Sequence, residues 1–198
     1  MEEIKKQGQG LNLTKLNLDY DGQKDGEEQA QNYLNIVNEK IGFIPNVLAS
    51  FSKFPKQFEG FTKLYNSLML GESGLTKLER EMIAVTVSSE NHCYYCIVAH
   101  GAAVREISND PQLGERIAAN FRSAELPLKQ EKLLEFSKKL TRDPSEIKEQ
   151  DRNELREAGY TDRDIWDISA IVGMFNMTNR LASATEMEPN ENYHNMAR

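Results

Sequence analysis

The sequence predicts an all-α protein, because apolar residues recur at helical spacing and no run alternates apolar and polar residues between hairpin turns. Most of its six prolines fall at the joints between the periodic segments. A chain of 198 residues can bury a sizeable core without disulfides or a structural metal. We therefore expect a single helical domain over residues 29–198, preceded by an extended polar arm over residues 1–28.

Each expected helix shows an apolar stripe together with residues that start or stop it. Gly42 and the turn Phe43–Asn46 should end the first helix, over residues 33–41. Thr76 with Glu79 three residues later predicts a capping box, and the Ser88–Asn91 cluster should interrupt the helix that follows. Within that helix, Val85–Val87 has strand propensity and is compatible with a single β segment. The other segments expected to be helical are 58–68, 113–121, 133–140 before Asp143-Pro144, one that closes at 155–159, and a long last helix over 161–181.

The charge balance excludes some classes of partner. The chain has 24 basic and 31 acidic side chains, a net charge of −7, and no run rich in lysine and arginine. Nucleic-acid binding depends on neutralising phosphates, so no nucleic-acid partner is expected. No stretch has the ~18 uncharged apolar residues of a membrane span, and residues 1–8 lack the apolar centre of a signal peptide. A cytoplasmic location is the expectation.

The two cysteines, Cys93 and Cys96, are expected to carry chemistry. They lie three residues apart, and a bridge between them closes too short a loop to hold a fold together. If Asn91 caps a new helix, Cys93 falls in its first turn. There the positive end of the helix dipole favours the thiolate over the thiol.

A histidine and a glutamate complete the candidate site. Spacings of three and four residues put Cys93, Cys96 and His100 on one helical face. His100 can then exchange a proton with the thiols, and Glu81 can orient its ring if the two helices pack together. Such a set suits peroxide reduction: one thiolate attacks the O–O bond, and the second thiol condenses with the sulfenic acid to a disulfide. A separate reductant must then reopen the ring.

Other uses of a Cys-x-x-Cys pair fit this chain less well. A zinc site completed by His92 or His100 lacks the second pair of ligands that a closed site needs. Covalent haem attachment requires histidine directly after the second cysteine, where Ile97 stands, and a thioredoxin fold requires βαβ units. No metal and no cofactor are therefore expected.

The pattern Glu-x11-Cys-x2-Cys-x3-His, met by Glu81, Cys93, Cys96 and His100, resembles the active site of the AhpD alkyl hydroperoxidases, in the carboxymuconolactone decarboxylase-like superfamily. The stretches that resemble its peroxidase-related branch are Glu79–Val85, Gly42–Asn46 and Phe175–Arg180. The resemblance covers about Ile41 to Leu181.

This resemblance implies an AhpD-like helical bundle that assembles into dimers, trimers or hexamers and reduces hydroperoxides with electrons from a dithiol partner. It implies that Cys96 is the peroxidatic thiol, Cys93 the resolving thiol, and Glu81 with His100 the proton relay. One position departs from the pattern: AhpD enzymes can carry a histidine just before the second cysteine, where this chain has Tyr95, a poor base near neutral pH. The decarboxylases of the superfamily act on a lactone without this cysteine pair.

Two alternative functions remain beside a thiol peroxidase: a non-enzymatic redox-responsive interaction protein that uses the cysteine couple as a switch, and a carboxymuconolactone decarboxylase-like enzyme. Several residues of the last expected helix are each compatible with more than one structural role. Its large apolar residues suit the core or a subunit interface better than a substrate-binding box, and its polar ones suit a patch near the site or buried amides that join helices. These residues are Trp166, Met174, Phe175 and Met177, and Asn176, Asn179 and Arg180.

Overall fold

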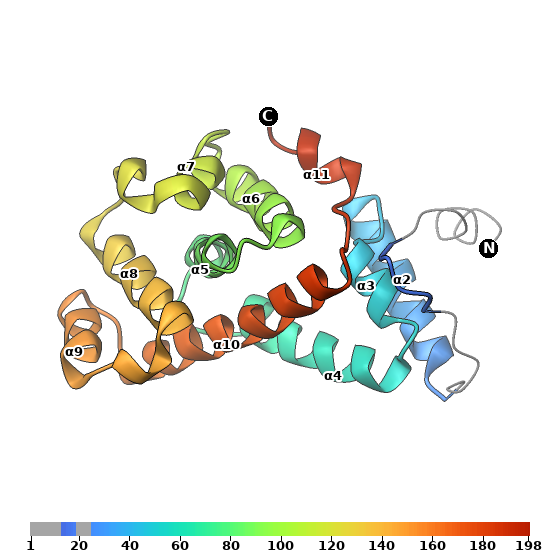
Figure 1. Ribbon diagram of the computed structural model, residues 1–198, viewed down its shortest axis with the longest axis horizontal. Coiled ribbons are helices and arrows are strands. Elements are labelled where there is room, and N and C mark those ends of the chain that lie inside the picture. The colour runs from blue at the N-terminus through green and yellow to red at the C-terminus, as the bar shows by residue number, and fades with distance from the viewer. Residues whose placement is uncertain (1–12, 19–24) are drawn as a thin grey trace.

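The computed structural model describes residues 13–18 and 25–198, and within them every regular element is a helix (Figure 1). The predicted all-α class is therefore confirmed. The predicted arm, 1–28, falls largely outside the described residues. The helices are α2 (Glu27–Ile41), α3 (Asn46–Phe51), α4 (Pro55–Tyr65) with the π-helical turn η1 (Asn66–Leu70), α5 (Lys77–Glu90), α6 (Tyr94–Ser108), α7 (Leu113–Asn120), η2 (Phe121–Ala124), α8 (Leu128–Arg142), η3 (Pro144–Glu146), α9 (Glu149–Glu157), α10 (Asp162–Ala184) and α11 (Glu191–Asn195).

Helix α5 is the centre of the fold. Figure 1 shows it nearly end-on, with α6, α7, α8 and α10 around it. Every residue from Met82 to Ser88 is buried, which is typical of a helix surrounded on all sides. The predicted capping box is present: the Glu79 backbone N–H donates to Thr76 Oγ1 at 3.1 Å, and the Thr76 N–H donates to Glu79 Oε2 at 2.8 Å. The strand considered for Val85–Val87 is wrong, because packing on all sides of a capped helix outweighs local β propensity.

Helices α2, α3 and α4 form a second, smaller cluster that adjoins the main bundle (Figure 1). Its centre includes Phe51 and Phe61, whose rings stack 4.4 Å apart, with Leu34 beside them. Helix α2 ends where the sequence predicts, at Gly42, whose φ of +82° suits glycine far better than other residues. The turn that follows Gly42 leads directly into α3. The backbone N–H of Val47 on α3 donates to the Tyr95 hydroxyl near the start of α6.

Helices α6 and α7 meet at two glycines. A Cβ on Gly114 would come within 2.7 Å of the Gly101 backbone oxygen and within 3.0 Å of its Cα. Both neighbours are backbone atoms, so neither can rotate away as a side chain can. The close approach of α7 to α6 therefore depends on the absence of a side chain at this position.

Helix α10 has one buried and one exposed face. Met174 and Phe175 are buried, as expected for core residues. Trp166 is 72% exposed and Met177 is 48% exposed, so these two residues are not part of the core. At 100° per residue, Trp166, Met177 and Leu181 fall within about 60° of one another around the helix.

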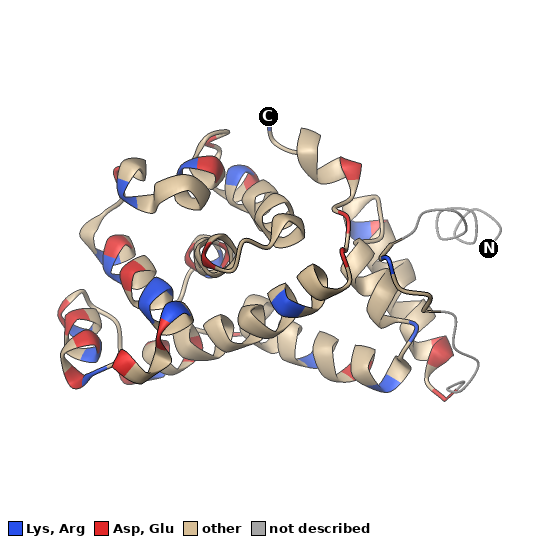
Figure 2. Cartoon of the chain, viewed as in Figure 1, with Lys and Arg blue, Asp and Glu red and all other residues tan. Residues whose placement is uncertain are grey.

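Charges of both signs are interleaved over the surface helices, most clearly on α8 and α9 (Figure 2). Among the described residues, no helix combines the length and the apolar character that a membrane crossing requires.

Candidate active site

The two cysteines lie at the tight turn between α5 and α6. Asn91 ends α5, His92 adopts a positive φ of 53°, and Cys93 is the N-cap of α6. The expectation that Asn91 caps α6 is wrong, since its side-chain amide donates instead to Asn176 and Asn179 on α10, at 3.1 and 3.0 Å. Cys93 thus lies one position before the first turn, still at the positive end of the helix.

Both thiols are free and almost fully buried, with 1% of Cys93 and 4% of Cys96 exposed. They are hydrogen-bonded to each other, and this bond is the main reason that the pKa of Cys93 falls to about 7. The same bond, together with burial, raises the pKa of Cys96. Negative charge on the reduced pair near neutral pH is therefore centred on Cys93, where the Cys96 S–H donor stabilises the thiolate.

Polar side chains from two helices, α5 and α10, lie against this pair. Ser183 contacts the Cys93 sulfur, while Asn179 and Ser88 contact the Cys96 sulfur, and each contact favours the anionic form of its thiol. Asn179 is fully buried and donates to Ser88 Oγ at 3.1 Å. Both roles considered for Asn179 are therefore present: it joins α10 to α5 and it lies at the thiol site.

Glu81 and His100 lie together beside the thiols. The His100 Nδ1 atom is 2.7 Å from Glu81 Oε2, and only about one-seventh of either side chain is exposed, 14% and 13% respectively. The Phe175 ring packs edge-on against the imidazole, with centroids 4.6 Å apart. Positive charge on His100 also helps to lower the pKa of Cys93. The structure thus brings the four residues of the sequence motif to one place.

Tyr95 does not stand in for the histidine that AhpD enzymes can carry before the second cysteine. Its buried hydroxyl oxygen accepts the Val47 backbone N–H at 3.1 Å and so joins α6 to α3. Burial raises the pKa of this phenol well above its usual value. The neighbouring Tyr94 points to solvent, with 59% of its surface exposed.

Comparison with known proteins supports what the motif implied. The carboxymuconolactone decarboxylase family matches residues 55–138. An uncharacterized peroxidase-related protein from Silicibacter sp. TM1040 is 51% identical over 96% of this chain and 98% of its own, with a TM-score of 0.90. The chain belongs to the AhpD-like carboxymuconolactone decarboxylase superfamily.

Two further solved structures agree with an AhpD-like fold. An AhpD-core, peroxidase-related protein from Ralstonia eutropha JMP134 is 36% identical over 94% of this chain and 97% of its own, with a TM-score of 0.88. The debrominase Bmp8 is 17% identical, covers 93% of this chain and 95% of its own, and has a TM-score of 0.73, which shows the common fold alone. No curated protein matches the chain.

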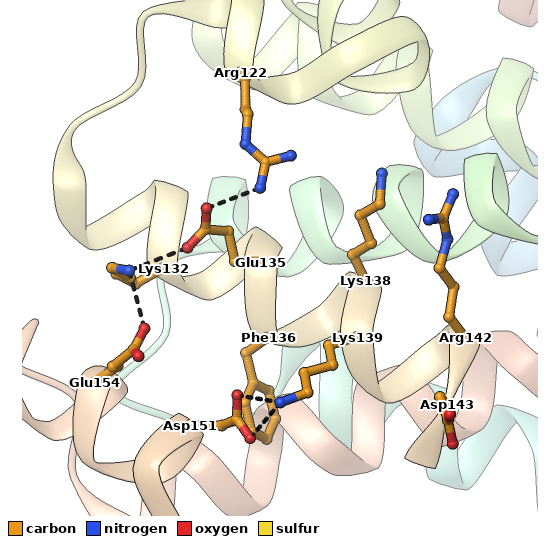
Figure 3. Close-up of a pocket in the computed structure, with 10 residues that line it drawn as sticks. All are labelled: Arg122, Lys132, Glu135, Phe136, Lys138, Lys139, Arg142, Asp143, Asp151 and Glu154. Atoms are coloured by element: carbon orange, nitrogen blue, oxygen red, sulfur yellow. Dashed lines mark hydrogen bonds and ion pairs between the residues drawn. The ribbon is translucent and has the colours of Figure 1, made fainter. Parts of the chain in front are cut away.

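The AhpD-like chain also has a charged surface pocket of about 520 Å³ on α8 and α9, which contains none of the motif residues (Figure 3). Its lysines are paired: Lys132 bonds Glu135 and Glu154, and Lys139 bonds Asp151. Because these charges neutralise one another, the pocket offers little to an anionic ligand. In the part of the chain that the structure describes, no three His, Cys, Asp or Glu side chains are arranged to hold a metal ion.

Proposed function

We propose that this AhpD-like protein is a thiol-dependent peroxidase that reduces organic hydroperoxides through Cys93 and Cys96. Its relatives at 51% and 36% identity are named peroxidase-related, which supports an alkylhydroperoxidase-like role at the family level. The observation that carries the finer proposal is the hydrogen-bonded pair of buried free thiols beside the Glu81–His100 pair. An acidic thiol, an adjacent thiol and an oriented imidazole are the groups that peroxide reduction needs.

In the first step, the Cys93 thiolate takes the proton of Cys96. The Cys96 thiolate then attacks the terminal oxygen of the hydroperoxide, the O–O bond breaks, and Cys96 becomes a sulfenic acid. The departing alkoxide receives the proton that Cys93 holds and leaves as the alcohol. Cys96 is thereby oxidised by two electrons, and Cys93 is a thiolate again.

In the second step, the Cys93 thiolate attacks the Cys96 sulfur. An S–S bond forms, and the S–O bond breaks to release hydroxide, which protonated His100 converts to water. Glu81 accepts a hydrogen bond from His100 and so keeps the ring in one orientation. An external dithiol must supply two electrons and two protons to restore the reduced pair.

The exposed apolar face of α10 supports a second part of the proposal, assembly into a homo-oligomer. Trp166, Met177 and Leu181 are too large and too exposed to be explained by the core of one chain. A second copy of the chain is the partner that the family resemblance implies. The cytoplasmic location stays a prediction from the sequence.

Stopped-flow measurement of the reduced protein with cumene hydroperoxide tests the proposed activity. We expect oxidation far faster than that of free cysteine. Cumene hydroperoxide should be preferred to hydrogen peroxide, because Ala99, Ala182 and Met187 form an apolar cluster with the cysteines. Cys96→Ser should lose the fast reaction, whereas Cys93→Ser should react once and stop at a sulfenic acid that dimedone traps. An unchanged rate in Cys96→Ser would refute the assignment of the attacking thiol.

Steady-state turnover with a small dithiol separates the enzyme from a redox switch. Continuous peroxide consumption with dithiothreitol is expected of the peroxidase. A protein that is oxidised once and changes its oligomer size, with no turnover, would instead be the redox-responsive interaction protein.

A further inference from the structure

Five side chains form an unbroken line of hydrogen bonds from the surface of α10 to the thiol site. Arg180, which is exposed, donates through Nη1 to Asn176 Oδ1 at 2.7 Å. The same Oδ1 accepts from Asn91 Nδ2 at 3.1 Å, and Asn91 Nδ2 also donates to Asn179 Oδ1 at 3.0 Å. Asn179 Nδ2 in turn donates to Ser88 Oγ at 3.1 Å. The line therefore connects α10, the turn between α5 and α6, and α5 itself.

The direction of every bond in this line is set at its surface end. An arginine can only donate, and Asn176 Nδ2 donates to the Val172 carbonyl, 3.0 Å away, which can only accept. Asn176 must therefore present its oxygen to Asn91, and Asn91 must turn its nitrogen toward that oxygen. The second N–H of Asn91 goes to the oxygen of Asn179. The nitrogen of Asn179 consequently faces Ser88.

Two donors are left over at the inner end of the line. Asn179 Nδ2 carries two hydrogens and uses one on Ser88, whereas Ser88 Oγ accepts that bond and keeps its own proton. Both side chains are fully buried, and both are hydrogen-bonded to the Cys96 sulfur in the sense that favours its anion. The Ser88 backbone is also fixed against the pair, because its carbonyl accepts the Cys93 N–H at 2.9 Å. Two neutral donors therefore converge on one sulfur.

We propose that Ser88 and Asn179 form a donor pair that stabilises the Cys96 thiolate, and that Asn91 is the residue that positions this pair. The inference deepens the proposed function and rests on it, since it concerns the same thiols. Cys96 becomes anionic only when its proton passes to the Cys93 thiolate, before the attack on the substrate. Donors already aimed at the Cys96 sulfur lower the free energy of that transfer and need no rearrangement. They thus favour Cys96 over Cys93 as the attacking thiol.

The ¹³C signal of the Cys96 Cβ atom, followed against pH in labelled protein, tests the donor pair without any substrate. The Cys93→Ser variant is the reference, because Cys96 is then the one thiol left in the chain. Loss of a donor to an anion raises the pKa of its acid, so adding Ser88→Ala should raise the midpoint and leave roughly three- to tenfold less thiolate at a pH below it. Ser89→Ala is the matched control, since Ser89 Oγ donates to the Ala118 carbonyl on α7, and it should not move the midpoint.

Two further variants extend the test. Asn91→Ala releases Asn179 from its fixed orientation and should shift the Cys96 midpoint in the same direction by a smaller amount, which also covers a Ser88 variant that does not fold. In the complementary Cys96→Ser protein, Ser88→Ala should leave the Cys93 midpoint unchanged, because Ser88 donates to Cys96.

The outcomes separate the donor pair from a purely structural role. An unshifted Cys96 midpoint in Ser88→Ala and Asn91→Ala, an equal shift in Ser89→Ala, or a shift at Cys93 as large as that at Cys96 would overturn the proposal. Peroxide reduction with unshifted midpoints would refute the donor pair alone. Shifted midpoints in a protein that reduces no peroxide would refute the proposed function alone.

Discussion

Glu81 Oε2 and His100 Nδ1 lie 2.7 Å apart, across the interface of the central helix α5 and the cysteine-bearing helix α6. Because Nδ1 is bonded to Glu81 Oε2, proton exchange with the thiols falls to the other ring nitrogen, Nε2. The contact therefore fixes both the orientation of the ring and the nitrogen that can act. It is the geometric basis of the proton relay in the proposed mechanism.

Replacing Glu81 by glutamine is expected to slow peroxide reduction by roughly tenfold or more, because the amide keeps the shape but no longer selects the imidazole tautomer. Stopped-flow rate constants with cumene hydroperoxide measure the effect. Glu90→Gln is the matched control, since Glu90 belongs to the same helix but pairs with Lys138 and Arg142. Equal losses in the two variants would contradict the relay.

Replacing Cys96 by alanine should raise the pKa of Cys93. In the wild type, the Cys96 S–H donor helps to lower that pKa to about 7, below the usual 9.0. Without the donor, the thiolate is less favoured, so the midpoint of a thiolate titration should move upward by roughly one unit, a tenfold loss of thiolate at pH 6. A midpoint that stays near 7 would show that the helix and His100 alone set the acidity of Cys93.

Replacing Trp166 by lysine should weaken the homo-oligomer. A charged side chain buried in an apolar contact loses its hydration, and the apolar interface offers no partner that compensates for this loss. Light scattering coupled to size-exclusion chromatography should show a smaller species at equal concentration. Leu128→Lys, at an exposed apolar position on α8, is the control and should leave the size unchanged. A wild-type monomer would contradict the proposed assembly directly.

Replacing Gly114 by alanine should destabilise the fold by about 1–3 kcal/mol, the usual cost of overpacking. The new Cβ would meet the Gly101 backbone at 2.7 Å, so α7 must move away from α6. Urea denaturation measures the change in the free energy of unfolding. Gly173→Ala, where a Cβ has no neighbour within 4 Å, should cost far less.

The sequence predicted most of the secondary structure because its signals are local. The capping box at Thr76, the stop at Gly42 and the last long helix are all present. The helix start before the cysteines was misjudged, because Asn91 is a good capping residue in isolation but finds partners on α10. Propensity cannot register a competitor that lies 85 residues away along the chain.

The candidate site was predictable only in part. The spacing of Cys93, Cys96 and His100 follows from one helix, and Glu81 was found through the motif. Ser88 and Ser183 were missed as site residues, since serine is common in every part of a protein and no spacing relates these two to the cysteines. Only their contacts with the sulfurs identify these two serines as part of the site.

By itself, then, the sequence determined the helical class and the four residues of the motif, because period, capping and spacing are properties of neighbouring residues. The tertiary structure alone decided which thiol has the lowered pKa and where Tyr95 is bonded. Each of these depends on burial and on hydrogen bonds between helices that are distant in sequence. Such contacts exist only once the core around α5 has formed.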